Sequence, residues 1–277
     1  MKSPLARPPR FAVAAGMIRV PGKDADPIYG DTFGGGTIID RHTPRAGAIA
    51  RIRGDELHHL RDVMRLGPGA AIRLIVGNGL EFDARVARLT ADYAEIEIVG
   101  LVESNRAAPT SIILATAIIK GPRMDFIVEK AAELGATMLW PLECARAVVR
   151  NPGEERLARW RRLALAATKQ SLTPRRMEIR PPLSVAEAVR EVPKETLAVV
   201  CTEGAEPLAA IVRRTRPRAM LIACGPEGDF DPAEYAAMET AGFVAAGLGP
   251  NRLRSETAAL AALSVAAGAL DEIERGI

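Results

Sequence analysis

The sequence predicts an α/β protein with a small β-rich domain followed by a larger domain whose mostly parallel sheet has helices on both faces. Between Thr37 and Val102 the apolar runs are short, and several alternate with polar residues as half-buried strands do. After residue 110, near-continuous apolar runs alternate with helical ones, which is typical of strands covered on both faces. The 277 residues, 48% of them hydrophobic, suffice for one large domain or two modest ones.

Residues 1–36 are predicted to form a Pro- and Gly-rich extension that is poorly ordered or draped over the surface. Pro8-Pro9, Asp26-Pro27 and Gly34-Gly35-Gly36 interrupt any regular pattern in this segment. Met17 offers an alternative start of the chain.

Residues 37–103 are predicted to form a small β-barrel with one helix, a shape common among RNA-binding domains. Gly77-Asn78-Gly79 has the composition of a hairpin turn between two of the strands. The expected strands are Thr37–Ile39, Ala48–Ile52, Ala71–Val76, Glu81–Leu89 and Ala94–Val99. The helix is expected over Gly54–Leu66, and its apolar side carries Leu57, Leu60, Val63 and Met64.

A polar linker over residues 103–110 leads into the second domain, expected over 110–277. Its strands and helices alternate, which predicts a mostly parallel sheet between two layers of helices. The expected strands are Ser111–Ile119, Thr137–Pro141, Leu197–Cys201, Met220–Cys224 and Phe243–Ala246. The expected helices are Met124–Leu134, Pro152–Lys169, one that starts at Asp231, and Glu256–Ile273.

Two loops near the C-terminus share one pattern: each follows an apolar run, carries Gly-Pro and leads into a helix. They start at Gly225 and at Gly247. Ligands bind outside the carboxyl ends of strands in open α/β sheets, and glycine permits close backbone approach. Either loop alone is as typical of an ordinary strand-to-helix turn. The two together, with Arg254 and Glu256 beside the second, favour one ligand pocket built from loop backbone.

Both helices that follow these loops are expected to begin with a capping side chain. Asp231 precedes Pro232 and is followed three residues later by Glu234, which is the order of a capping box. Ser255 is expected to cap the last helix.

Several other kinds of site are not supported by the sequence. Gly77-Asn78-Gly79 leads into a strand, so it fails the dinucleotide-binding pattern, and no Walker loop occurs. The histidines His42, His58 and His59 lie in or just before the predicted barrel, so neither a Ser-His-Asp triad nor a metal site is expected.

The cysteines and the hydropathy favour a cytoplasmic protein. Cys144, Cys201 and Cys224 lie far apart in the sequence without redox-pair or metal-ligand spacing, so free thiols in a reducing compartment are expected. No apolar run is long enough to span a membrane.

Arginine is clustered in two parts of the chain, although the formal net charge is only +3. Solvated helix faces are the simpler interpretation of most charge runs. Few acids interleave between Arg156 and Arg176, however, so an RNA phosphate backbone is the favoured partner. The two groups are Arg41, Arg45, Arg51, Arg53, Arg61 and Arg65, and Arg146, Arg150, Arg156, Arg159, Arg161, Arg162, Lys169, Arg175, Arg176 and Arg180.

Gly225-Pro-Glu-Gly228, Leu248-Gly-Pro250 and Leu253-Arg-x-Glu-Thr-Ala258 together resemble the signature of the SPOUT superfamily. Within it, the chain is similar to the RsmE-type ribosomal RNA small-subunit methyltransferases. Gly54–Leu66 resembles the barrel helix of that family, Lys120–Gly135 its first catalytic-domain helix, and Lys169–Ser171 its Glu-Gln-Ser/Cys segment. The resemblance runs from about Thr37 to the end of the chain.

A few positions depart from the family pattern. Asp229 stands where a second glycine is usual, and Asn251-Arg252 stands where Arg-Ile or Arg-Val is usual. Lys169 replaces an acid, and the arginine common after Gln-Ser is shifted to Arg175 or Arg176.

The resemblance implies a PUA-like barrel and a SPOUT methyltransferase domain with a C-terminal trefoil knot, a rare exception among folds. It implies S-adenosyl-L-methionine bound in the knot, a homodimer whose site draws on both subunits, and methylation of N3 of one uridine in 16S rRNA of the small ribosomal subunit. The implied cofactor-binding residues are Thr202, Glu203, Gly204, Gly225, Pro226, Glu227, Gly228, Leu248, Gly249, Pro250, Leu253, Arg254, Ser255, Thr257 and Ala258. The implied RNA-binding residues are His59, Arg61, Arg65, Lys120, Arg123, Lys169, Gln170, Arg175 and Arg176.

Arg254 and Glu256 are the predicted catalytic residues. Arg254 would favour the negative charge that forms on the uracil ring, or would orient an RNA phosphate. Glu256 would accept the N3 proton or orient Arg254. Two alternatives stay open: a SPOUT methyltransferase that acts on transfer RNA or on a ribose 2′-hydroxyl, and a non-catalytic RNA-binding or ribosome-assembly factor.

Overall fold

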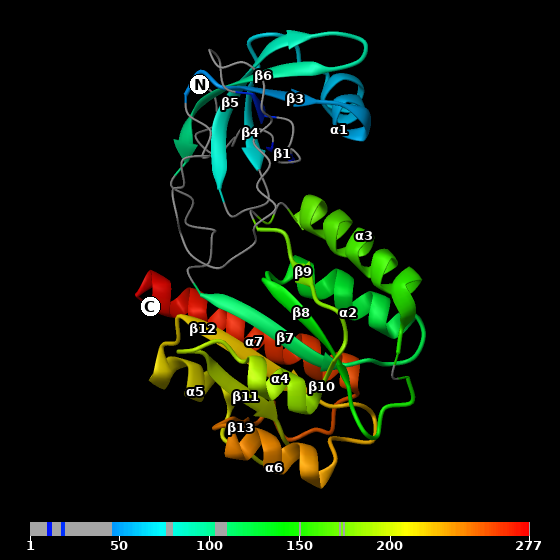
Figure 1. The fold of residues 1–277 in the computed structure, drawn as a ribbon. Coiled ribbons are helices and arrows are strands. Elements are labelled where there is room, and N and C mark those ends of the chain that lie inside the picture. Colours follow the sequence, from blue (N-terminus) through cyan, green and yellow to red (C-terminus); the bar gives the residue numbers. More distant parts are fainter. Residues whose placement is uncertain are drawn as a thin grey trace. The chain divides into compact units, whose positions relative to one another are not determined.

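A computed structural model of the protein describes residues 10–12, 18–19, 46–75, 80–102, 110–149, 151–171, 173 and 175–276. They belong to two compact units, one of residues 1–107 with 172–175 and the other of residues 108–171 with 176–277 (Figure 1).

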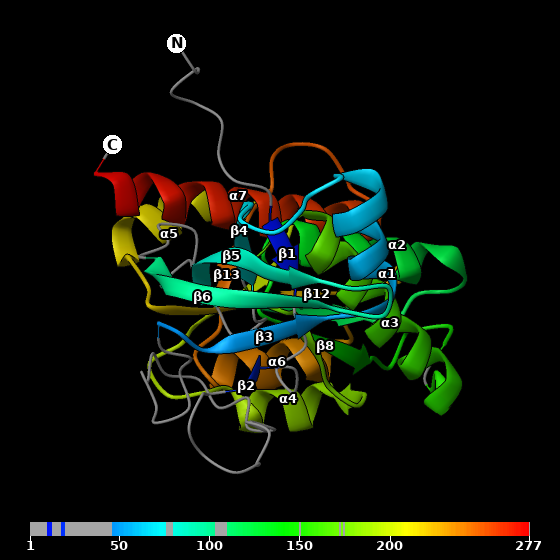
Figure 2. The ribbon, with the colours of Figure 1, turned by 90° about the horizontal axis from the view of Figure 1, so that it is seen from above.

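The first unit contains a six-stranded sheet in the order β1-β4-β5-β6-β3-β2. All its pairings are antiparallel except that of β1 with β4. Figure 2 shows β5, β6 and β3 lying in this order. Leu74, Phe82 and Ile96 fill its core. The strands are β1 Arg10–Ala12, β2 Ile18–Arg19, β3 Ile49–Ile52, β4 Ala71–Ile75, β5 Glu81–Leu89 and β6 Ala94–Val102.

Four of the five strands expected in this unit are confirmed as β3 to β6. The fifth, over Thr37–Ile39, and the turn at Gly77–Gly79 lie outside the described residues. β1 and β2 lie in the segment treated as an extension outside the barrel, and their pairing with β4 and β3 places them in its sheet.

The single helix expected over Gly54–Leu66 is instead a short α-helix, α1 (Gly54–His58), followed by a π-helical turn, η2 (His59–Val63). The backbone N–H of Met64 donates to the carbonyl of His59, five residues earlier. This wider turn changes the spacing of the apolar face, so Leu57 and Leu60 are buried while Val63 and Met64 are exposed. The prediction that one regular helix carries all four on a common apolar side is therefore wrong.

The second unit contains a seven-stranded, entirely parallel sheet in the order β10-β8-β7-β12-β11-β13, with β9 also paired to β8. Its strands are β7 Ser111–Ala117, β8 Met138–Glu143, β9 Glu178–Ile179, β10 Leu183–Ser184, β11 Leu197–Cys201, β12 Ala219–Cys224 and β13 Val244–Ala246. Its helices are α2 Pro122–Glu133, α3 Gly153–Ser171, α4 Val185–Glu191, α5 Leu208–Thr215, α6 Pro232–Thr240 and α7 Ser255–Arg275.

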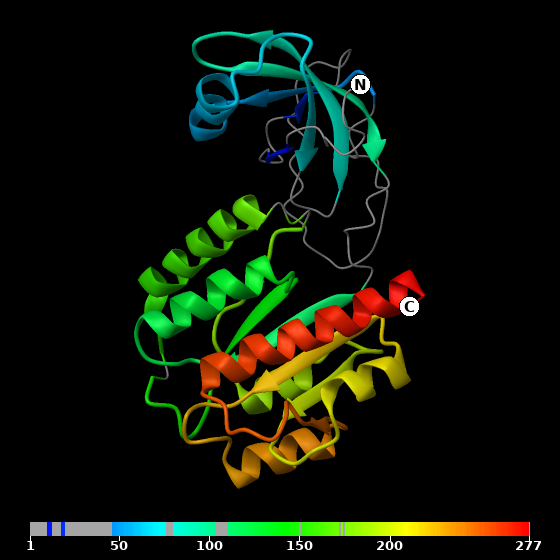
Figure 3. The same cartoon turned by 180° about the vertical axis from the view of Figure 1, so that it is seen from behind.

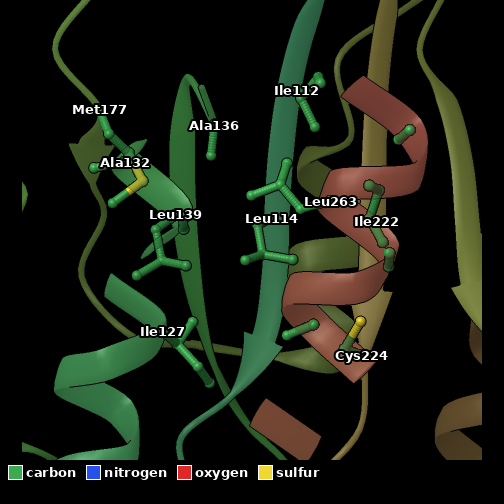
Figure 4. Packing of buried hydrophobic residues seen from close by; sticks show 14 of the residues in the cluster. Ile112, Leu114, Ile127, Ala132, Ala136, Leu139, Met177, Ile222, Cys224 and Leu263 are labelled. Carbon is green, nitrogen blue, oxygen red and sulfur yellow. The ribbon is translucent and has the colours of Figure 1, made fainter. Parts of the chain in front are cut away.

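Helices cover both faces of this sheet, as the sequence predicts. One core cluster joins the sheet to α2, α3, α5 and α7, and the other joins its opposite face to α4 and α6. Figure 3 shows α2, α3 and α7 across one face, and Figure 4 shows Leu263 of α7 beside Leu114 of β7 and Ile222 of β12. The buried side of α7 is mostly alanine, which lets the helix axis lie close to the sheet.

At its C-terminus the chain turns back from the edge of the sheet toward the middle. β13 is the edge strand beside β11, yet the helix that follows it, α7, packs back on β12 and β7. The start of α7 therefore lies at the same edge of the sheet as the carboxyl ends of these strands.

Candidate functional site

Four loops gather at the carboxyl edge of the parallel sheet. The strands β7, β12, β11 and β13 are neighbours in this order and run in one direction, so the segments that follow them emerge side by side. We call them the β7 loop (residues 118–121), the β12 loop (225–231), the β11 loop (202–207) and the β13 loop (247–254). Such an edge is where open α/β sheets bind ligands.

The β12 loop turns at Asp229, which has a φ of 63°. This is a backbone conformation that glycine adopts freely and that aspartate and asparagine tolerate better than other residues. Asp229 Oδ1 accepts hydrogen bonds from the Phe230 N–H and the Tyr235 hydroxyl, both 2.8 Å long. The departure from the usual glycine therefore leaves the turn intact, because aspartate adopts the same conformation and ties it to α6.

Tyr235 is one of the side chains that support this turn. Burial is the main cause that raises the pKa of Tyr235 to about 12, and the nearby Asp229 carboxylate adds to it. Tyr235 therefore stays protonated as a donor to Asp229 at any physiological pH.

The segment after β8 also holds the β12 loop. Arg146 Nη1 donates to the carbonyl of Gly228 over 3.3 Å. Glu234 accepts from the N–H groups of Ala145 (2.8 Å) and Asp231 (2.7 Å), and with the Asp231 side chain it forms the predicted capping box of α6. The sequence did not single out Arg146 or Tyr235 for this purpose, since neither shares a motif with the residues it supports.

The β13 loop begins where two backbones meet without room for a side chain. The N–H of Gly247 donates to the carbonyl of Glu206 (2.7 Å), and the carbonyl of Gly247 accepts from the N–H of Leu208 (3.0 Å). A Cβ at Gly247 would lie 2.4 Å from the carbonyl oxygen of Ala205. Only glycine fits at this crossing of the β11 and β13 loops.

The rest of the β13 loop is open. Gly249 has a φ of 118°, and a Cβ there would meet no atom of the described chain within 4 Å. Leu248 packs against the core beneath, and Leu253 is half-buried. This combination leaves backbone accessible beside apolar side chains, as a bound organic ligand requires.

Arg254, and not Ser255, is the N-cap of α7, and no side chain caps this helix. Ser255 is the first helical residue and is buried, so the capping prediction is wrong here. Arg254 has an extended backbone, is exposed, and makes no ion pair with any residue that the structure describes. Its guanidinium therefore remains available to a substrate at the helix start.

Glu256 lies one residue into α7 and faces Arg123 of α2. Arg123 Nη2 lies 3.0 Å from Glu227 Oε1, and its Nη1 lies 3.6 Å from Glu256 Oε2. Glu227 belongs to the β12 loop and is a predicted cofactor-binding residue, whereas Glu256 is a predicted catalytic residue. The guanidinium of Arg123 therefore contacts one residue of each kind.

A polar group and two thiols lie at the base of the site. Thr116 of β7 is fully buried beside Cys224 in the register of the sheet, and its hydroxyl has no hydrogen-bond partner among the described residues. Cys201 and Cys224, far apart in sequence, place their sulfurs 3.5 Å apart as free thiols. The contact with Cys201 and burial raise the pKa of the Cys224 thiol well above its ordinary range. Thr116 had a visible signal, since it is a polar residue within a long apolar run.

The predicted cofactor-binding residues all fall in the β11, β12 and β13 loops or the first turn of α7, which lie at one edge of one sheet. Some of these residues are exposed to solvent. One of them is Glu203, whose carboxylate lies 3.8 Å from Nε of Arg252.

The predicted RNA-binding residues divide between the two units. His59, Arg61, Arg65 and Arg175 belong to the first, and Lys120, Arg123, Lys169, Gln170 and Arg176 to the second. Arg61 donates to the Asp62 carboxylate and to the carbonyl of Ala91. The hydrogen bond from Arg61 is the main cause that lowers the pKa of Asp62 to about 2. The side chain of Lys169 lies outside the described residues.

Several arginines of the second cluster have partners within the protein. Arg159 pairs with Asp125, and Arg180 pairs with Glu191 and lies over the Trp140 ring. Arg156 and Arg162 on α3 are exposed and make no ion pair within the described part of the chain. The charge excess predicted for RNA contact is therefore carried by fewer residues than the sequence suggests.

No group of three or more His, Cys, Asp or Glu side chains in the described ranges is arranged to hold a metal ion. No helix in the same ranges combines the length and hydropathy needed to cross a bilayer.

Comparison with known proteins gives the family context of this site. An RNA methyltransferase domain family matches residues 106–267, and an RNA methyltransferase PUA domain family matches residues 52–99. Both matches agree with the expected order of a PUA-like domain followed by a methyltransferase domain.

Relatives and solved structures agree with these matches. Ribosomal RNA small subunit methyltransferase E of Mycobacterium bovis is 32% identical over 79% of this chain and 86% of its own length. That of Bacillus subtilis is 29% identical over 77% of this chain and 87% of its own. A crystal structure of ribosomal RNA small subunit methyltransferase E from Neisseria gonorrhoeae bound to S-adenosyl methionine has a TM-score of 0.70 and 29% identity, and covers 93% of this chain and 96% of that one.

Proposed function

Because the chain belongs to the ribosomal RNA small subunit methyltransferase E family, we propose that it transfers a methyl group from S-adenosyl-L-methionine to N3 of one uridine in 16S rRNA. The protein is an RNA methyltransferase that acts on the small ribosomal subunit, and its reaction takes place in the cytoplasm. The gathering of four strand-end loops beside the exposed Arg254 is the observation that carries this proposal.

The residues present fit S-adenosyl-L-methionine. Gly249 leaves loop backbone accessible, and Leu248 and the half-buried Leu253 supply apolar surface for the adenosine part. The hydroxyl of Thr116, near the end of β7, has no hydrogen-bond partner within the described residues. Buried polar groups without partners are rare in folded proteins, so a ligand group is a reasonable partner for Thr116. When bound, the cofactor supplies an activated methyl group on its sulfonium.

The chain itself supplies alignment and charge. The uridine must be unpaired or flipped out so that its N3 edge faces the methyl group. Loss of the N3 proton leaves negative charge on the ring, which the guanidinium of Arg254 would stabilise. The carboxylate of Glu256, on a largely buried side chain in the first turn of α7, would accept that proton or orient Arg254. Most of the acceleration would come from holding nitrogen and methyl carbon in line.

The exposed arginines of α3 and the basic residues of the first unit would contact phosphates. Arg156 and Arg162 present charge that the described chain does not neutralise, and binding through such contacts should weaken as salt rises.

The family resemblance extends the proposal to a trefoil knot and a homodimer. The crossing at Gly247 and the return of α7 over β12 and β7 are consistent with a threaded chain. An experimental structure with an unknotted backbone would contradict the knot. Sedimentation of the purified protein as a monomer at micromolar concentration would contradict the homodimer.

One experiment tests the function. The pure protein is incubated with labelled S-adenosyl-L-methionine and small subunits from a strain that lacks the modification, and the product is mapped by mass spectrometry. We expect one label, on a 16S uridine base, at a position where primer extension halts because an N3 methyl blocks Watson–Crick pairing. Label on a ribose 2′-hydroxyl, or on transfer RNA supplied in a parallel incubation, would mean that the protein methylates a different substrate. No cofactor binding at millimolar concentration would favour a non-catalytic RNA-binding or assembly factor.

A further inference from the structure

Arg123 lies between two carboxylates that come from different segments of the site. Its Nη2 contacts Glu227 Oε1 of the β12 loop at 3.0 Å, and its Nη1 lies 3.6 Å from Glu256 Oε2 in the first turn of α7. The three residues come from α2, a loop after β12, and α7, which are far apart in sequence.

The carboxylate of Glu256 depends on this contact. Only 14% of its side chain is exposed, its Oε2 is inaccessible to solvent, and that atom has no hydrogen-bond partner within the described residues. A desolvated carboxylate needs an opposite charge close by. The N-terminus of α7 contributes some positive potential, and the guanidinium of Arg123 contributes a full charge.

The backbone around Arg123 fixes where its side chain starts. Gly121, the N-cap of α2, has a φ of 73° and a ψ of −150°, a region essentially restricted to glycine, and Pro122 follows it at the start of the helix. The same first turn is anchored to α3, because Asp125 accepts from Trp160 Nε1 over 3.0 Å and pairs with Arg159. Asp125 is thus engaged elsewhere and does not compete for Arg123.

We propose that Arg123 is a positioning residue for methyl transfer: it holds the Glu256 carboxylate in place and ties the β12 loop to the start of α7. This role rests on the proposed function and adds a residue that acts through Glu256 rather than on the RNA. It differs from the phosphate contact that the sequence predicts for Arg123, because both of its ion-pair partners among the described residues are carboxylates of the protein itself.

The test compares Arg123→Ala and Arg123→Lys with wild type in kcat, in KM for the RNA substrate, and in cofactor affinity by calorimetry. We expect Arg123→Ala to lower kcat by about 100-fold, as for a misplaced catalytic group, with KM for RNA nearly unchanged. Arg123→Lys should recover part of the rate because an ammonium can face one carboxylate but not both. Arg275→Ala, at the other end of α7 and paired only with Asp271 in the described residues, is the matched control.

A rise in KM for RNA with kcat spared, accompanied by a weaker salt dependence of binding, would overturn the proposal in favour of a phosphate contact. Equal activity of wild type and Arg123→Ala would overturn it as well.

A second measurement does not need activity. In thermal unfolding, Arg123→Ala, Glu256→Gln and the double variant form a cycle. Coupled side chains predict that the double variant loses less Tm than the sum of the two single losses, whereas strict additivity would refute the contact. If coupling is found but wild type transfers no methyl group to small-subunit RNA, the proposed function fails while the Arg123–Glu256 contact stands.

Discussion

The β12 and β13 loops carry the same Gly-Pro pattern in the sequence, yet the structure builds them in opposite ways. Side chains hold the β12 loop: Asp229 occupies a left-handed conformation, Tyr235 donates to it, and Arg146 donates to the carbonyl of Gly228. The β13 loop is held mainly at its start, by the backbone bonds of Gly247 and the packing of Leu248. Beyond that point Gly249 faces open space, and the ion pair of Arg252 with Glu203 is largely exposed.

The difference suggests two roles: the β12 loop shapes the pocket, and the β13 loop contacts the ligand. A loop fixed by its own side chains keeps its geometry before any ligand arrives, which lowers the ordering cost of binding. A loop fixed mainly at its start can present to a ligand both accessible backbone and the guanidinium of Arg254, which has no ion pair with the described residues. The four variants below test this division, beginning with the largest expected effect.

Gly247→Ala should disturb both the fold and the pocket. Its Cβ would lie 2.4 Å from the carbonyl oxygen of Ala205, and the clash is with backbone, which cannot rotate away. We expect a loss of about 3 kcal/mol, as for severe overpacking, seen as a fall in Tm of roughly 6–12 °C. Gly268→Ala is the matched control, since a Cβ there meets no neighbour within 4 Å. An unchanged Tm for Gly247→Ala would mean that the two loops do not cross as described.

Gly249→Val should spare most of the fold and abolish cofactor binding. A β-branched residue at a φ of 118° is strained by roughly 1–3 kcal/mol, and its side chain would fill the space that the loop leaves open. Calorimetry with S-adenosyl-L-methionine checks the affinity, and circular dichroism checks the fold. Wild-type affinity would show that no ligand approaches the backbone here.

The sequence predicted the elements of this site better than its contacts. β5 and β11 match their expected bounds to the residue, and both loops were found from Gly-Pro after an apolar run. Local patterns report which residues are buried and where a strand ends. They do not report strand order, so nothing in the sequence placed β7 beside β12 or brought Thr116 next to Cys224.

Four further features could not be predicted from local sequence patterns. The pairing of β11 with β12 brings Cys201 and Cys224 together, and the return of α7 brings Glu256 to Arg123. The π turn at His59–Val63 changes the helical spacing, and it contains no proline or glycine from which this change could be predicted. Ser255 is a good capping residue by type, yet Arg254 takes that position.

Arg254→Ala should separate catalysis from binding in the β13 loop. The guanidinium is exposed at the helix start and makes no ion pair with the described residues, so its removal leaves the fold unchanged. We expect methyl transfer to fall by about 100- to 1,000-fold, as when a donor to developing negative charge is lost. Cofactor affinity by calorimetry should change little. An equal loss of both would refute the catalytic assignment, and Arg275→Ala serves as the control.

Tyr235→Phe should have the smallest effect, and it tests whether side chains hold the β12 loop. The variant removes one hydroxyl whose hydrogen bond to the Asp229 carboxylate is 2.8 Å long and partly exposed, so the expected loss is about 1 kcal/mol. Urea unfolding of the two proteins at several pH values measures it.

The pH dependence of stability is a second measure of the environment of the Tyr235 hydroxyl. Folding raises the pKa of Tyr235 to about 12, above the value of about 10 in an unfolded chain. The folded state therefore binds this proton more tightly, and the advantage over Tyr235→Phe should be complete below pH 10 and should shrink as pH rises toward 12. Parallel stability curves up to pH 11 would mean that neither burial nor Asp229 raises the pKa of Tyr235 in the folded protein. A loss as large as that of Gly247→Ala would instead mean that the β12 loop depends on this single bond, rather than sharing its support with Arg146 and Glu234.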